Sequence, residues 1–234
     1  MDAQTITYRY LFTFRDGRHR EFVVNLDPDT LALKTPPRAN PPEWTRMDTF
    51  RCHHCPLPQD TAHCPMAVAL EDLIEFFAQS LSYEEAEVSV EGGGRTIMKH
   101  TSVQAGMSSL LGLYMATAGC PVMDMLRPMS RFHLPFASLD ETKYRAISMY
   151  LTAQFFRARH GLPADWELKD LARIYADVRE VNLNICQKLS NRKVKDASLN
   201  AVSILDTFAE FTRASIDYDM LEELEGLFAP YLKR

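Results

Sequence analysis

Apart from one helical stripe, the spacing of apolar residues differs before and after Thr101, and this difference constrains the fold more than any other feature. Before Thr101, apolar and polar residues alternate in short runs, which is typical of half-buried strands. After Thr101, apolar residues recur every three or four positions over long stretches, as on one face of an α-helix. We therefore expect an α+β protein, in which N-terminal antiparallel β-hairpins and one amphipathic helix pack on a C-terminal bundle of about five to six helices.

The first hundred residues predict two hairpins. Asp16 and Gly17 separate the first two alternating runs, and three glycines at 92–94 separate the last two. A helical stripe of apolar residues lies between the hairpins, from Met66 to Phe77. The expected strands cover residues 5–14, 22–26, 31–33, 86–90 and 95–100.

The rest of the chain predicts helices. Ser138 with Glu141, and Asp219 with Glu222, have the spacing of capping boxes at two helix starts. The uncharged stretch 101–123 is long enough to span a bilayer, but its glycines, proline and polar residues favour a buried core helix. The expected helices cover residues 102–118, 121–129, 139–159, 166–190, 196–216 and 219–232. We expect a β-rich half (1–100), which contains the cysteine-rich segment, and a helical half (101–234) to pack as one compact unit.

Four of the five cysteines form the strongest functional signal. Cys52 and Cys55 share a Cys-x-x-Cys turn, and Cys64 follows closely enough for one loop to bring three thiols to one ion. Cys64 and Cys120 each precede a proline and a helical run, which predicts thiols at helix N-termini, where backbone N–H groups stabilise a thiolate. We therefore expect these four cysteines to bind a metal. His63 is the alternative fourth ligand, and His53 and His54 are further candidates.

The sequence leaves the metal open between Zn²⁺ and a [4Fe-4S] cluster, because both accept four thiolates. The histidines around the loop favour zinc, whereas the cysteine–proline pairs suit an iron–sulfur cluster equally well. Two other interpretations of the thiols remain: a dithiol redox pair at Cys52 and Cys55, or buried packing without a ligand. Cys186 lies within an apolar helical stripe and is predicted to be a packed free thiol.

A group of basic residues follows Cys120 and carries a second hypothesis. Arginine binds carboxylates and phosphates through paired hydrogen bonds, and histidine titrates near neutral pH. Ion pairs with Asp124, Asp140 and Glu141 are the structural explanation for the same arginines, and we favour it. The candidates are Arg127, Arg131 and Arg145 for an anion site, and His100 and His133 for acid–base catalysis.

Charge and the N-terminal residues limit the partners. A formal net charge of -5 at pH 7 argues against a nucleic-acid partner, because binding to the phosphate backbone needs positive surface. Residues 1–10 lack the apolar segment of a signal peptide, so we expect a cytoplasmic protein without membrane association; a protein partner stays open and no oligomeric state is indicated.

The leading interpretation is a cytosolic metal-binding protein with a structural or sensory thiolate site and a regulatory or interaction role. One alternative is an enzyme that acts on a small anionic substrate next to the metal site, with a pocket joining Cys120, Arg127 and His133. A dithiol redox protein is the second alternative.

Overall fold

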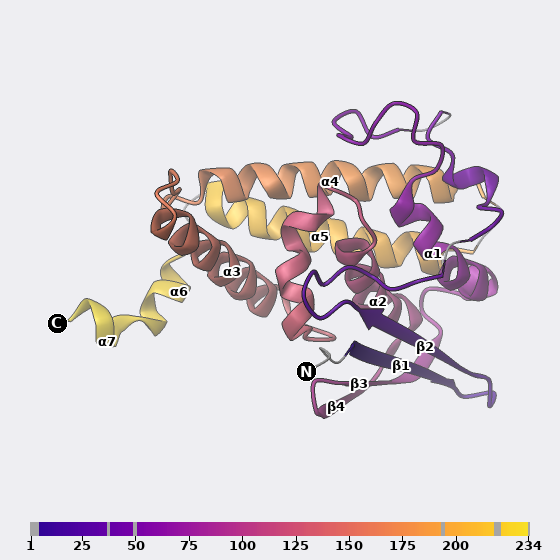
Figure 1. Ribbon diagram of the computed structural model, residues 1–234. Coiled ribbons are helices and arrows are strands. Elements are labelled where there is room, and N and C mark those ends of the chain that lie inside the picture. Colours follow the sequence, from indigo (N-terminus) through magenta and orange to yellow (C-terminus); the bar gives the residue numbers. More distant parts are fainter. Residues whose placement is uncertain (1–4, 37, 49–50, 193–194, 218–220, 234) are drawn as a thin grey trace.

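Both hairpins contribute to one four-stranded antiparallel sheet in the computed structural model (Figure 1). The structure describes residues 5–36, 38–48, 51–192, 195–217 and 221–233. The strands are β1 (Ile6–Phe14), β2 (His19–Leu26), β3 (Glu85–Gly92) and β4 (Arg95–Ser102), in the order β2-β1-β3-β4. The hairpins join because β1 also pairs with β3, which places Tyr10 opposite both Phe22 and Val90.

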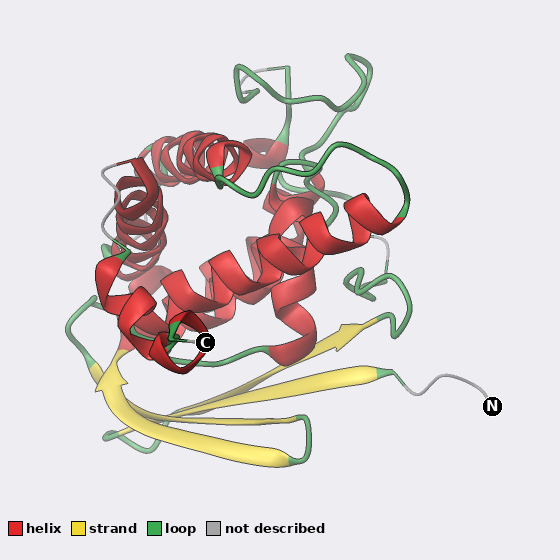
Figure 2. Ribbon diagram, turned by 90° about the vertical axis from the view of Figure 1, so that its left-hand side faces the viewer, coloured by secondary structure: helices red, strands yellow, loops and turns green. Residues whose placement is uncertain are grey.

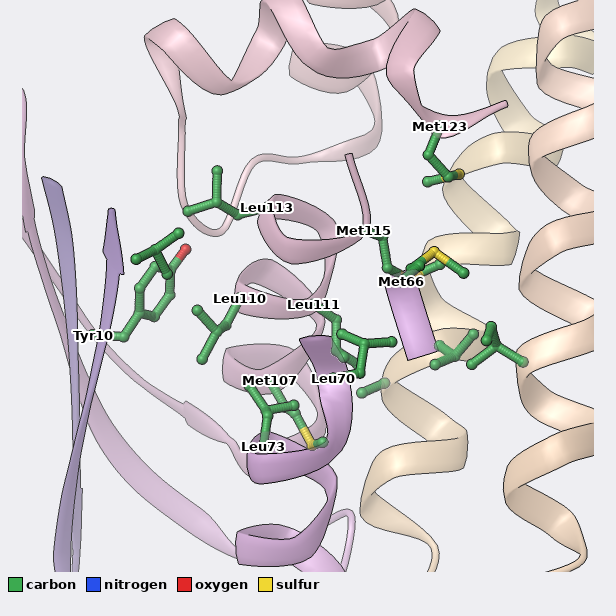
Figure 3. Close-up of a cluster of buried hydrophobic side chains, with 14 of the residues drawn as sticks. Tyr10, Met66, Leu70, Leu73, Met107, Leu110, Leu111, Leu113, Met115 and Met123 are labelled. Carbon is green, nitrogen blue, oxygen red and sulfur yellow. The ribbon is translucent and has the colours of Figure 1, made fainter. Parts of the chain in front are cut away.

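The sheet buries one face under helices. Tyr8, Tyr10, Phe12 and Phe14 alternate along β1 and are all buried, while the residues between them face outward and are exposed. The helices α1 (Pro65–Phe76) and α2 (Val103–Thr117) supply the apolar side chains that pack on this face. Figure 2 shows the sheet as one layer beneath the helices, and Figure 3 shows Tyr10 pointing from the sheet toward the α2 side chains.

The helical half continues the same core. Its helices are α3 (Leu139–Arg159), α4 (Lys169–Ser190), α5 (Ala197–Asp217), α6 (Glu222–Leu227) and α7 (Ala229–Leu232). Short 3₁₀ helices occur at η1 (Glu43–Thr45), η2 (Phe77–Gln79) and η3 (Met123–Phe132). These elements confirm the predicted α+β class. One hydrophobic cluster includes residues from both sequence halves, although the division at residue 100 stays a prediction.

Two local predictions for the helical half are confirmed. The Ser138–Glu141 capping box is present: Glu141 N donates to Ser138 Oγ at 3.2 Å, and Ser138 N donates to Glu141 Oε2 at 2.8 Å. The uncharged stretch 101–123 supplies α2, and ten of the fifteen residues of α2 are buried. Across the described ranges, no helix is long and apolar enough to cross a membrane.

Several predicted boundaries are wrong. The short third strand is reduced to one bridge between Leu26 and Leu33, because Leu31 adopts a left-handed conformation with φ of 59°. The helix expected over 121–129 is the 3₁₀ helix η3, which contains Pro128, a residue that cannot donate an α-helical hydrogen bond. The helix expected over 219–232 is split at Phe228 into α6 and α7. The Asp219–Glu222 capping box involves Asp219, which lies outside the described residues.

The first strand also reaches the end of η3. The Tyr8 hydroxyl donates to the carbonyl oxygens of Ser130 and Arg131 at 2.9 and 3.0 Å. The Tyr10 hydroxyl lies 2.9 Å from Ser109 Oγ and is hydrogen-bonded to His133 Nε2. β1 therefore fixes the loop that follows η3.

Candidate metal centre

The segment around Cys52 and Cys55 is a closed loop beside α1 and α4 (Figure 1). Cys55 N donates to Cys52 O at 3.1 Å, which forms the expected turn between the two cysteines. Arg51 closes the loop, because its guanidinium donates to Leu57 O at 2.7 Å and to Pro58 O at 2.8 Å. Two ordered loop carbonyls therefore hold the arginine next to Cys52 in a fixed position.

The base of the loop leads directly into α1. Cys64 N donates to Thr45 O at 2.8 Å, so the residues before and after the loop pair with each other. Cys64 is the N-cap residue of α1, and Pro65 occupies the first turn, as the cysteine–proline pair predicts. The backbone N–H groups of Ala67 and Met66 lower the pKa of the Cys64 thiol, although burial outweighs them and raises it overall.

Cys120 lies at a similar but not identical chain turn. The N-cap of η3 is Val122, so the prediction that Cys120 itself caps a helix is wrong by two residues. Its carbonyl oxygen nevertheless accepts from Asp124 N at 2.9 Å. Burial raises the pKa of the Cys120 thiol, and the N–H groups of Met123 and Val122 lower it in part. Backbone donors of a first turn therefore act on both Cys64 and Cys120.

The fold brings the four cysteines into one electrostatic group. Burial raises the pKa of Cys52 to about 12, and the thiols of Cys64, Cys120 and Cys55 raise it further. All of these cysteines are free thiols. Cys186 lies apart on α4, where its Sγ is 4.0 Å from Leu199 O, and Ser203 and Asp206 act on its pKa. Four thiols thus lie near one another, and the fifth does not belong to the group.

A lysine from α4 faces this thiol group. Lys188 is only 6% exposed, and its Nζ donates to Trp44 O at 3.4 Å and to Arg46 O at 3.3 Å. Burial lowers the pKa of Lys188, while Cys64 and Cys52 raise it. The ammonium group in turn lowers the pKa of Cys64. A fixed positive charge therefore lies where thiolates would need compensation.

The neighbouring histidines are positioned by protein groups. His54 Nδ1 lies 2.8 Å from Glu180 Oε1, and His54 Nε2 is buried without a hydrogen-bond partner among the described residues. A carboxylate that orients one ring nitrogen and leaves the other free is common behind metal-binding histidines. His63 Nδ1 is 2.7 Å from Thr45 Oγ1, and His53 is exposed. Both His54 and His63 thus remain candidate ligands.

Coordinating distances are not reached in this arrangement. Within the described ranges, no three His, Cys, Asp or Glu side chains have the mutual spacing needed to hold a metal ion. The donor chemistry still fits a soft cation, because the grouped side chains are thiols with a nearby ammonium group and first-turn N–H donors. Zn²⁺ or an iron–sulfur cluster would be held by Cys52, Cys55, Cys64 and Cys120.

Sequence reasoning missed the roles of two α4 residues: Lys188, which contacts the segment just before the loop, and Glu180, which contacts the loop itself. Lys188 bonds to Arg46 and Trp44, which lie 142 and 144 residues earlier in the chain. Glu180 bonds to His53, which lies 127 residues earlier. The only local signal was a lysine at a buried position of the α4 apolar stripe, next to Leu189.

The basic residues after Cys120 have different surroundings in the structure. Arg127 pairs with Asp124, which confirms the structural explanation for that arginine, and Arg131 is exposed. His100 is exposed as well and lies 3.0 Å from Glu87. Arg145 and His133 instead line a cavity whose wall includes neither Cys120 nor Arg127. This cavity is therefore not the pocket joining Cys120, Arg127 and His133 that the enzyme hypothesis expects.

Comparison with known proteins assigns a family. Residues 6–229 match the family model described as a domain of unknown function (DUF6901). The chain belongs to this family. The match covers the sheet, all four grouped cysteines and the helices through α6, so the family includes the entire candidate site. No curated protein and no solved structure matches the chain.

His133 predicts a measurable loss of stability in acid. Burial, with the nearby guanidinium groups of Arg145 and Arg95, lowers the pKa of His133 from 6.5 to about 3. Between these values the unfolded chain binds more protons than the folded chain, so the free energy of unfolding falls as the pH is lowered. From about pH 7.5 to about pH 4.5, we expect His133 to contribute a loss of about 2–3 kcal/mol.

Urea unfolding at several pH values measures this contribution. His133→Gln, which cannot gain a proton in this range, is expected to show a shallower pH dependence than the unmodified protein. His100→Gln is the matched control, because the His100 side chain is 83% exposed. Identical pH dependence in His133→Gln and the unmodified protein would show that the imidazole is not buried in its neutral form.

Proposed function

We propose that the protein binds a metal through Cys52, Cys55, Cys64 and Cys120, and that this centre is structural or sensory rather than catalytic. The observation that carries the proposal is the grouping of these four thiols, each within electrostatic reach of Cys52. The fifth cysteine, Cys186, is excluded from the group. Cysteines that only fill space in a core do not have to lie near one another. These four do, although they come from a loop, a helix start and a distant turn.

Metal binding would change the protonation of this group. Burial keeps the thiols of Cys52, Cys64 and Cys120 protonated, so a metal must displace these protons as it binds. Lys188 and the first-turn N–H groups then offset part of the negative charge of four thiolates.

A structural role follows from what the loop connects. Cys64 at its base pairs with Thr45 and is the N-cap residue of α1, and His53 within it contacts Glu180. A metal held there would tie the proline-rich segment and α1 to α4. Four thiolates also leave no free position on zinc, which supports a regulatory or interaction role over catalysis. We further place the protein in the reducing cytoplasm, where five free thiols persist.

Metal content tests the proposal directly. After anaerobic purification of the full chain, we expect either about one zinc per chain, or about four iron and four labile sulfide with a visible absorption band. Cys52→Ser, Cys64→Ser and Cys120→Ser are expected to lose the metal. Cys186→Ser is the matched control and is expected to retain it.

Three outcomes would contradict parts of the proposal. Absence of zinc, iron and sulfide overturns it. Loss of metal in Cys186→Ser to the same extent as in Cys64→Ser would assign the effect to altered folding. If Cys120→Ser retains the metal and His63→Ala or His54→Ala loses it, the fourth ligand is that histidine and not Cys120. A reversible Cys52–Cys55 disulfide in metal-free protein, measured by thiol alkylation, would favour the dithiol redox function instead.

A further inference from the structure

A cavity of about 300 Å³ lies among α2, η3, α4 and α5, away from the cysteine loop. Its volume is that of a small-molecule site. Most of the wall is apolar. In the part of the chain that the structure describes, no acidic side chain and no cysteine lines it, whereas the basic residues Lys99 and Arg145 do. The apolar wall side chains include Leu113, Leu126, Val178, Leu205 and Phe208.

Two deeply buried polar residues in the wall lack partners. Asn182 is 1% exposed, and neither Nδ2 nor Oδ1 forms a hydrogen bond with any described residue. Ser130 is 3% exposed, and its Oγ is likewise unpaired within the described chain. Buried amides and hydroxyls are costly unless they form hydrogen bonds, so unpaired ones in a cavity wall mark positions for polar groups of a ligand.

Arg145 gives one end of the cavity a positive charge. Its Nη2 donates to Met129 O and Phe132 O, both at 3.1 Å, which fixes the orientation of the guanidinium. Arg145 makes no ion pair within the described ranges, although Glu141 acts on it at longer range. Ser130 follows Met129 directly, so its unpaired hydroxyl lies at the same end. A carboxylate is the natural partner of this pair.

Asn182 lies further along α4 than Tyr175. Burial raises the pKa of Tyr175, and the charge of Arg145 lowers it in part, so Arg145 acts on the Tyr175 side of the cavity wall. Tyr175, Val178 and Asn182 occupy one face of α4 and all line the cavity. Tyr175 and Asn182 are about 10 Å apart along the helix axis, with apolar wall between them. The cavity wall therefore carries separate polar groups at Arg145 and at Asn182, with the apolar side chain of Val178 between Tyr175 and Asn182 on α4.

We infer that this cavity binds a small amphipathic monocarboxylic acid. The carboxylate binds Arg145 and Ser130, the apolar chain contacts Leu113, Val178 and Phe208, and a hydroxyl or carbonyl at the far end binds Asn182. The site is separate from the proposed metal centre and does not depend on it. It also explains why the cavity wall contains basic but no acidic side chains among the described residues.

Calorimetric titration of the full chain tests this inference with three probes: decanoate, decan-1-ol and 10-hydroxydecanoate. We expect decanoate to bind at least about tenfold more tightly than decan-1-ol, because only the carboxylate forms charge-assisted hydrogen bonds with Arg145. We expect 10-hydroxydecanoate to bind more tightly than decanoate, because its terminal hydroxyl satisfies Asn182. Equal affinities for decanoate and decan-1-ol, or no binding of any probe, would overturn the inference.

Single substitutions test the contacts of Arg145 and of Asn182 separately. Arg145→Met is expected to remove the preference for decanoate over decan-1-ol, and Asn182→Leu to remove only the preference for the hydroxylated acid. Arg131→Met is the matched control, an exposed arginine outside the cavity, and is expected to bind all probes unchanged. Circular dichroism checks folding, and Arg145→Gln, which also removes the charge but keeps a polar side chain, replaces Arg145→Met if that variant does not fold. An undiminished decanoate preference in folded Arg145→Met would assign the binding to another site.

Discussion

Replacing Phe12 by alanine is expected to lower the free energy of unfolding by about 3–5 kcal/mol. Phe12 is fully buried at the centre of the sheet face, with its ring centroid 5.0 Å from that of Phe77 and 6.0 Å from that of Phe22. α2 approaches so closely there that a Cβ on Gly106 would lie 2.9 Å from the Phe12 ring. The helix cannot easily fill the space that the ring leaves, so the cavity should persist.

The register of β1 is tested by comparing the free energies of unfolding of Phe12→Ala and Leu11→Ala, both measured in urea. Leu11 is the neighbouring residue on the outer face and is 39% exposed, so its replacement should cost less than about 1 kcal/mol. A one-residue shift of β1 would exchange the two faces. A larger loss for Leu11→Ala than for Phe12→Ala would therefore show that the alternating pattern was assigned to the wrong face.

Arg192→Met is expected to cost about 3 kcal/mol or more, because it leaves a buried carboxylate without its charged partner. Glu71 on α1 is 7% exposed, and its Oε2 accepts from Arg192 Nη1 at 2.8 Å and from the Trp44 indole. The Arg192 guanidinium also lies 5.0 Å from the centre of the Trp44 ring. This cluster holds the segment that precedes the cysteine loop against α1 and the end of α4.

Two comparisons make the Arg192 prediction specific. Arg173→Met removes an exposed arginine that pairs with Asp170, and should cost less than about 1 kcal/mol. The double variant Glu71→Gln with Arg192→Met removes both charges and should be more stable than Arg192→Met alone. Equal losses for Arg192→Met and Arg173→Met would show that the Glu71 carboxylate is hydrated rather than buried.

The parts of the fold that local sequence determines were predictable. The alternation in β1 and the Ser138 capping box depend on neighbouring residues, and both appear as expected. The error at η3 had a visible cause, because Pro128 lies inside the stretch that was assigned to a helix. Leu31 differs: its left-handed backbone carries no residue-type signal, since leucine rarely adopts that conformation.

The candidate sites were predictable only where they, too, depend on neighbouring residues in the sequence. Cys64 at the start of α1 follows from the proline after it. The positions of Lys188 and Glu180 depend on how α4 packs, which no local pattern encodes. Asn182 did leave a signal, because an amide stands among Val178, Val181 and Ile185 in an apolar stripe. A polar residue in such a stripe is a reason to look for a cavity.

The contacts between β1 and the end of η3 also determine when the chain can fold during synthesis. The partners of the Tyr8 and Tyr10 hydroxyls lie 122 and 123 residues further along the chain. At about 5–20 residues per second, the ribosome adds those partners several seconds after the first hairpin has formed. The part of the face that carries Phe12 and Phe22 can be covered earlier by Phe76 and Phe77, whereas the hydroxyls of Tyr8 and Tyr10 have to wait for η3 and His133 to be synthesised.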